Sequence, residues 1–166
     1  MSLGGTLTAT DQAVSLTATQ GSILSPSAYS IGIGTGSLTL LAARTIGTSS
    51  SPLLVTSSAG ATLSAQAGTS MWLSSSGPMT LSSLDAATGI TYTQSSGDIT
   101  VGDVDATAGG TVSIAATTGA ILNDSDATNR IRANQVTLSA AQSSIGGGTA
   151  LAVPPPMLLW AALSVT

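Results

Sequence analysis

The sequence predicts an all-β protein that folds as a right-handed parallel β-helix, a solenoid of roughly seven coils. Three observations predict this fold. A short motif recurs about every 22 to 25 residues, apolar and polar residues alternate within the motif, and the apolar residues are almost all aliphatic. The chain has no Phe, two Trp and two Tyr, so Val, Ile, Leu, Ala and Met must fill its interior. Such residues suit a narrow core built in layers.

The motif is a run of apolar, any, apolar, any, Ala, followed by a short polar stretch that closes on Gly-any-Ile. It is clearest at 14–18, which closes at Ile23, and at 112–116, which closes at Ile121. Looser copies begin at Leu38, Leu63, Ile90 and Val136. A fixed period in the twenties is typical of a solenoid, in which each coil stacks on the one before it.

Alternation within the motif predicts strands rather than helices. Val112, Ile114 and Ala116 are spaced by two, which places them on one side of a strand with Ser113 on the other. Frequent Gly, Ser and Thr also disfavour helices. We therefore expect the apolar motif positions to face one continuous interior: Val14, Leu16, Val112, Ile114, Val136 and Leu138.

Further strands complete each coil. A second strand is expected near each closing Ile, most clearly at 99–101, and a third is suggested by 53–55, Val104 and Ile131. Coils should stack about 4.8 Å apart, and the right hand is expected because crossovers between parallel strands are almost always right-handed. Residues 66–88 fit the pattern poorly, which predicts a loop or an irregular coil there.

The chain divides into a β-helix repeat region, 1–153, and a Pro-rich apolar tail, 154–166. Three consecutive prolines open the tail and end the repeat. We expect its apolar segment, 157–160, to fold back over the last coil as an end cap. Neither end shows a polar cap, so end-to-end self-association through open strand edges is expected.

Charge and cysteine content exclude several classes of function. Three Arg and no Lys cannot form the basic surface that nucleic acids require. The absence of Cys excludes disulfides, Cys-ligated zinc and thiol catalysis. The N-terminal residues show no signal peptide, and the apolar run at 157–163 is far shorter than the ~20 residues of a membrane span.

Residues 97–114, Gly-Asp-Ile-Thr-Val-Gly-Asp-Val-Asp-Ala-Thr-Ala-Gly-Gly-Thr-Val-Ser-Ile, resemble a repeat unit of filamentous-haemagglutinin-type adhesins. Residues 129–140 and the following Ile145-Gly146 are similar to the same unit. The resemblance covers about 6–153. It implies part of a very long right-handed β-helix that bacteria export through an outer-membrane partner and display as an adhesin or as a stalk. The family's N-terminal secretion domain and a C-terminal effector are not seen in this sequence.

Aspartates form the main concentration of charge. Asp103 and Asp126 lie about one coil apart, as do Asp105 and Asp124 to within a few residues. Because stacked carboxylates repel, a calcium ion could relieve them, which makes these four residues weak metal candidates. The calcium-loop pattern that starts at Asp103 fails at its twelfth position, Ile114, where a Glu belongs. Solvated turn residues are the favoured interpretation, and we expect neither a metal nor a cofactor.

An alternative interpretation is a glycan-degrading β-helix enzyme with carboxylates Asp98, Asp103 and Asp105 in a cleft. Such an enzyme needs a base or a charge-stabilising cation beside the carboxylates. The chain has no Lys or His, and Arg130 and Arg132 are expected in a different part of the coil, so no catalytic residue is expected. Arg130 and Arg132 are expected to point outward and to pair with Asp124 or Asp126.

A third interpretation is a carbohydrate- or ice-binding solenoid. Trp72 and Tyr92 could stack on a sugar, although the favoured role of a lone Trp such as Trp72 is to cap an irregular core. Thr-any-Thr pairs start at Thr6, Thr17 and Thr91, and an ice-binding face would need them aligned in two straight ranks. Asn123-Asp124-Ser125 matches the glycosylation triplet, a frequent chance match in a Ser-rich chain.

The sequence thus favours a non-catalytic structural shaft of a large secreted or surface-displayed bacterial adhesin. Its expected partners are cell-surface glycans or proteins and, for the parent protein, the outer-membrane export partner.

Overall fold

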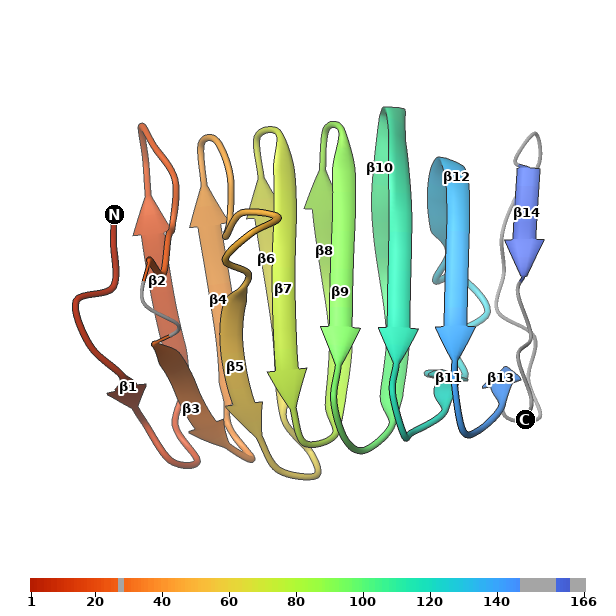
Figure 1. The fold of residues 1–166 in the computed structure, drawn as a ribbon, viewed down its shortest axis with the longest axis horizontal. Helices are drawn as coiled ribbons and strands as arrows, with labels where there is room; N and C mark the ends of the chain where they lie inside the picture. Colours follow the sequence, from red (N-terminus) through yellow and green to blue (C-terminus); the bar gives the residue numbers. More distant parts are fainter. Residues whose placement is uncertain (27–28, 147–157, 162–166) are drawn as a thin grey trace.

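The computed structural model describes residues 1–26, 29–146 and 158–161 as a parallel β-solenoid with no helix (Figure 1). From β2 to β9 successive strands run in opposite directions (Figure 1), and each strand of the solenoid pairs in parallel with a strand one coil away. The structure has about six turns. In Figure 1 the downward strands lie in front while the chain advances from left to right, so the coil is right-handed, as predicted.

The strands form two faces, which we name A and B. The first, face A, contains β2 (Val14–Ala18), β4 (Ser37–Ala42), β6 (Thr62–Ala67), β8 (Met79–Ala86), residues 99–106 of β10 (Ile99–Ala116), β11 (Ile121–Asn123), residues 131–133 of β12 (Ile131–Ala140) and β13 (Ile145–Gly146). The second, face B, contains β1 (Leu7–Thr8), β3 (Ser30–Gly34), β5 (Leu53–Ser57), β7 (Ser70–Ser76), β9 (Gly89–Gln94), residues 111–116 of β10, residues 135–140 of β12 and β14 (Leu158–Ala161).

Two strands and two turns therefore make one coil, rather than three strands. The strand β10 passes from face A to face B through a turn that includes Gly109, whose φ of 85° lies in the left-handed region favoured by glycine. Of the expected third strands, 53–55 lies on face B within β5, whereas Val104 and Ile131 are in register with each other on face A.

The interior is one continuous aliphatic cluster that runs along the solenoid axis. On β4, buried Leu38, Leu40 and Ala42 alternate with outward residues, as the period of a strand requires. Of the six motif residues expected to face one interior, Val112, Ile114, Val136 and Leu138 belong to this cluster and the other two pack against it, which confirms that prediction. Val14 and Leu16 are only half-buried, because β2 is the last strand on its side of the sheet.

Alanine occupies the last inward position of each main face A segment. In-register pairing joins Ala18 to Ala42, Ala42 to Ala67 and Ala67 to Ala86, and it joins Ala106 to Ala133. Most of these residues are almost completely buried. They lie next to the turn into the following strand, where a small side chain lets the chain close the coil without overpacking.

The coils differ in length, so the sequence motif does not fall on the same face of every coil. Leu38 pairs with Leu63, whereas Leu63 pairs with Leu81, a much shorter step along the chain. Motif copies that begin at Val14, Leu38 and Leu63 therefore lie on face A, whereas those that begin at 90, 112 and 136 lie on face B. Of the loop or irregular coil predicted at 66–88, the loop is wrong, since β7 and β8 are strands there, whereas the coil is irregular: it is short, and the pairing of β8 with β6 shifts register after Leu81.

Of the tail, the structure describes only the backbone of β14, which pairs in parallel with β12. The three prolines lie outside the described residues, so the end-cap prediction remains a prediction. No helix suited to crossing a membrane occurs among the residues that the structure describes.

Candidate functional sites

A polar column runs across the outside of face A, one residue per coil. Gln66 pairs in register with Asp85, Asp85 with Asp105, and Asp105 with Arg132. Gln66 Nε2 donates a hydrogen bond of 3.4 Å to Asp85 Oδ2. Stacking places the Asp85 and Asp105 carboxylates on neighbouring coils, where they repel each other. The guanidinium of Arg132 compensates this charge at one end of the column.

Arg132 contacts two carboxylates at once. Its Nη1 lies 3.3 Å from Asp103 Oδ1 and 3.3 Å from Asp105 Oδ2. The three side chains are 29–39% exposed, so water screens the attraction and the network adds little to stability. It does hold both carboxylates against the sheet.

The expected pairing of Arg132 with Asp124 or Asp126 was therefore wrong. Arg132 follows Asp105 by one coil, and that coil is long because residues 124–130 loop out between β11 and β12. The same insertion invalidates the expected stacking of Asp103 on Asp126. On the next coil, Asp103 Oδ1 instead accepts a hydrogen bond of 3.3 Å from the backbone amide of Arg130.

The inserted loop uses its own aspartates to shape its backbone. Asp124 Oδ1 accepts a hydrogen bond from the Asp126 amide at 3.0 Å, and Asn129 Nδ2 donates to Asp124 Oδ2. Asp126 Oδ1 accepts from the amide and the hydroxyl of Thr128 at 2.8 and 2.7 Å. These bonds, the amide's first, lower the pKa of Asp126 because they favour the carboxylate. Such turns are typical of Asp in loops.

The four metal candidates thus fall into two separate sets. Asp103 and Asp105 bind Arg132, whereas Asp124 and Asp126 bind groups of their own loop. Within the described part of the chain, no three acidic side chains gather so that they could hold a metal ion.

Of the carboxylates considered for glycan cleavage, Asp103 and Asp105 share Arg132, contrary to its expected place elsewhere in the coil, and Asp98 is separate. Asp98 lies in a turn, where its Oδ1 accepts a hydrogen bond of 2.8 Å from the Ala120 amide on the next coil. Asp103 and Asp105 lie outward on β10. A shallow groove of about 330 Å³ on face A contains none of the three. It is lined by Thr39, Leu40, Leu41, Ser64, Ala65, Gln66, Ser83 and Asp85.

Sequence reasoning did not single out Asp85 or Gln66, the two members of the polar column in this groove. The steps along the chain from Gln66 to Asp85, from Asp85 to Asp105 and from Asp105 to Arg132 are unequal. This irregular spacing conceals the column in the sequence. The polar column can be recognised only when the length of each coil is known.

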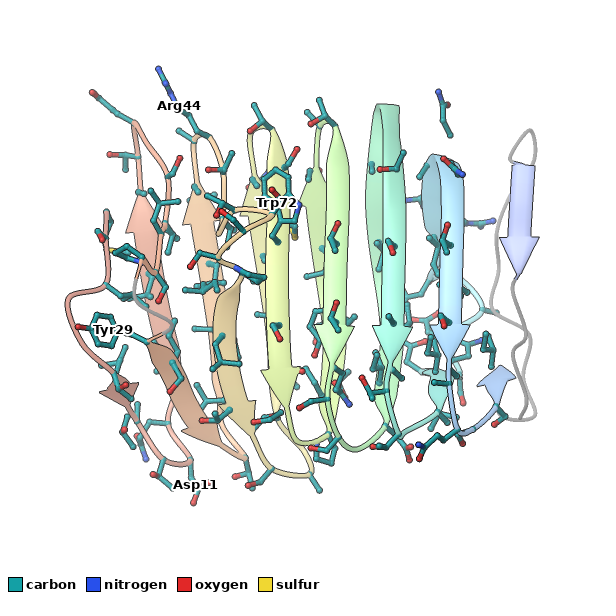
Figure 2. The ribbon with its side chains drawn as sticks, in the orientation of Figure 1. Asp11, Tyr29, Arg44 and Trp72 are labelled. Carbon is teal, nitrogen blue, oxygen red and sulfur yellow. The ribbon has the colours of Figure 1, made fainter. Side chains whose placement is uncertain are left out.

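The two central aromatic residues have different positions. Tyr92 is 1% exposed in the interior, so it cannot stack on a sugar. Burial raises the pKa of its hydroxyl well above the ordinary value. Trp72 lies outward on β7 of face B and is half-buried (Figure 2), so the expectation that it caps an irregular core was wrong.

The Thr pairs do not form two straight Thr ranks. On face A the rank that contains Thr17 continues with Leu41 and Gln66. On face B, Thr91 is followed by Ser113 and then Thr137. Asn123 of the glycosylation triplet is half-buried and in register with inward Val101, a position that restricts access to its amide.

Comparison with protein-family models, curated proteins and solved structures found no match for this chain.

Proposed function

We propose that this chain is a non-catalytic structural shaft, a β-helical segment of a large bacterial protein that is secreted or displayed on the cell surface as an adhesin. The observation that carries the proposal is the continuous aliphatic interior beneath in-register parallel strands. Each coil is hydrogen-bonded to its neighbours along the axis, so a pull along that axis loads many bonds at once. Such an arrangement favours a stiff rod.

The surface chemistry supports the same proposal. The carboxylates considered for catalysis bind backbone amides or Arg132, and none faces a general base. Neutral Ser and Thr side chains keep a rod soluble while leaving its faces tolerant of substitution. Cell-surface glycans or proteins are the proposed partners, with an outer-membrane partner for export of the parent protein.

The coding sequence that flanks this chain in its genome provides the first test. An upstream secretion domain followed by further repeats would support the shaft, whereas an adjoining carbohydrate-active domain would contradict it. Purified chain should also release no reducing ends from a panel of bacterial and plant polysaccharides. Release that is lost in an Asp103→Asn/Asp105→Asn variant would favour the enzyme instead.

Single-molecule pulling tests the mechanical role. Tandem copies held at their ends should unfold at high force in steps of about one coil, because each coil contacts only its neighbours. Unfolding of each copy at low force would overturn this role.

A further inference from the structure

Charge is distributed unequally between the two faces. The charged side chains of the chain are seven Asp and three Arg, and all lie in described residues. None belongs to a face B strand segment. They lie on face A strands, in turns or in the 124–130 loop: Asp11, Arg44, Asp85, Asp98, Asp103, Asp105, Asp124, Asp126, Arg130 and Arg132. Figure 2 shows Asp11 and Arg44 at opposite edges of the solenoid. Face B is therefore an uncharged surface on a chain of net charge −4.

Two outward ranks of face B also consist of short side chains over the coils of β9, β10 and β12. One outward rank runs from Thr91, which follows Trp72 on the preceding coil, to Ser113 and Thr137. The parallel rank runs through Thr93, Ala115 and Ser139. Neither of these two ranks carries a long side chain over the three coils; the third outward rank, Gly89, Thr111 and Gln135, ends in an exposed Gln at one edge. Short side chains also lose little rotamer freedom when another surface covers them.

We propose that two copies of this chain stack face to face through face B. Two β-sheets with short side chains can approach to about 10 Å and interdigitate. Because face B carries no charged side chain, two copies can bring it together across a two-fold axis without placing a charge against its own copy. The acidic side chains of both copies then remain in solvent, where their repulsion is weakest. Stacking through face A would instead oppose two Asp-containing columns.

The area of face B indicates a weak, reversible contact. Six strands about 4.8 Å apart, each with about five residues of 3.3 Å, give face B an area of roughly 500 Å² per copy, of which the three coils with short side chains supply about half. The total of roughly 1,000 Å² lies at the lower end of specific protein interfaces. Pairing of longer rods would add area with every coil, so face B is suited to side-by-side bundling of shafts. This inference does not depend on the proposed function.

Charge placed at the centre of face B tests the proposal. Ser113 is outward on β10 between Thr91 and Thr137, so Ser113→Asp and Ser113→Lys each set like charges against each other in the dimer. Ser64 is outward on β6 of face A and equally half-buried, so Ser64→Asp and Ser64→Lys are matched controls. Circular dichroism verifies that each variant keeps its β-structure, and sedimentation equilibrium up to about 1 mM measures association.

The wild type and both Ser64 variants should dimerise, whereas each Ser113 variant alone should associate at least about tenfold more weakly. An equimolar mixture of Ser113→Asp and Ser113→Lys should regain dimers, because opposite charges now meet. A monomeric wild type at about 1 mM would overturn the proposal. Association that the Ser113 substitutions leave unchanged would also overturn it and would point to contact through strand edges. A mixture that stays monomeric would show that face B does not meet its own copy.

Discussion

The hydroxyl oxygen of Tyr92 lies 2.6 Å from the Oγ of Ser75, inside an interior that is otherwise largely aliphatic. Both groups also bond to the side-chain oxygen of Gln94, at 3.0 and 3.1 Å. Gln94 Nε2 in turn donates to the carbonyl of Gly97 at 2.8 Å. Every member has a partner, so this buried polar cluster avoids the cost of an unsatisfied group.

Replacing Tyr92 with Phe should lower the free energy of unfolding by about 0.5–1.5 kcal/mol. The ring still fills its layer, while Ser75 and Gln94 lose one partner and keep each other. Urea unfolding followed by circular dichroism measures the change. An unaltered midpoint would mean that the cluster contributes nothing to stability.

Alkaline pH should destabilise the wild type through the same residue. Burial, the largest cause, raises the pKa of Tyr92 above the ordinary 10.0, so the folded state favours the neutral phenol. The unfolded chain releases this proton near pH 10, and the contribution to stability is complete below that pH and lost as the pH rises above it. Thermal melts between pH 9 and about 12 should fall more steeply for the wild type than for Tyr92→Phe. Parallel curves would contradict this assignment.

Ile114 and Ser113 are adjacent on β10, but the first faces the interior and the second faces outward. Ile114 is completely buried, and Ile114→Ala should cost about 2–5 kcal/mol because it removes buried methyl groups and leaves a cavity. Ser113 points outward, and Ser113→Ala should change stability by no more than about 0.5 kcal/mol. Denaturant unfolding at concentrations where the chain is monomeric tests both. Equal costs at the two positions would be incompatible with the described orientation of β10.

The alanine positions should resist enlargement. Ala86 is 1% exposed at the end of β8, and Ala86→Leu should destabilise the chain by about 1–3 kcal/mol through overpacking. Leu84→Met, two residues earlier on the same inward side, nearly conserves volume and should cost less than about 1.5 kcal/mol. If Ala86→Leu left the free energy of unfolding unchanged, the turn would contain an unfilled cavity and would not be closely packed.

Period and alternation were sufficient to predict the solenoid and its inward residues. Ile114 and Leu138 could be assigned to the interior from spacing two alone, because that rule acts within one strand. The phase between coils could not be predicted, since the step from Leu63 to Leu81 is shorter than the motif suggested. Coil length depends on turns, whose Ser, Gly and Thr residues resemble those of the strands.

Which outward side chains meet depends on how residues of neighbouring coils are paired. Arg132 contacts Asp105 only because a loop lengthens the coil between them. No feature of residues 124–130 in the sequence indicated that they form an insertion. Tyr92 was ambiguous for a different reason, since an aromatic residue with a hydroxyl can be buried or exposed until its partners are known. Ser75 and Gln94 are those partners, and both come from strands whose register was uncertain in the sequence.

Disulfide trapping tests whether the coils stack in this register, because the chain has no Cys of its own. Ser64 and Ser83 pair in register on neighbouring coils of face A, whereas Ser64 and Thr91, the pair that the motif spacing would align, lie on opposite faces. In-register Cα atoms about 4.8 Å apart are within disulfide reach. Under mild oxidation, Ser64→Cys/Ser83→Cys should form an intramolecular disulfide that peptide mapping detects, and Ser64→Cys/Thr91→Cys should stay reduced. Bonding in the second variant and none in the first would contradict this structure.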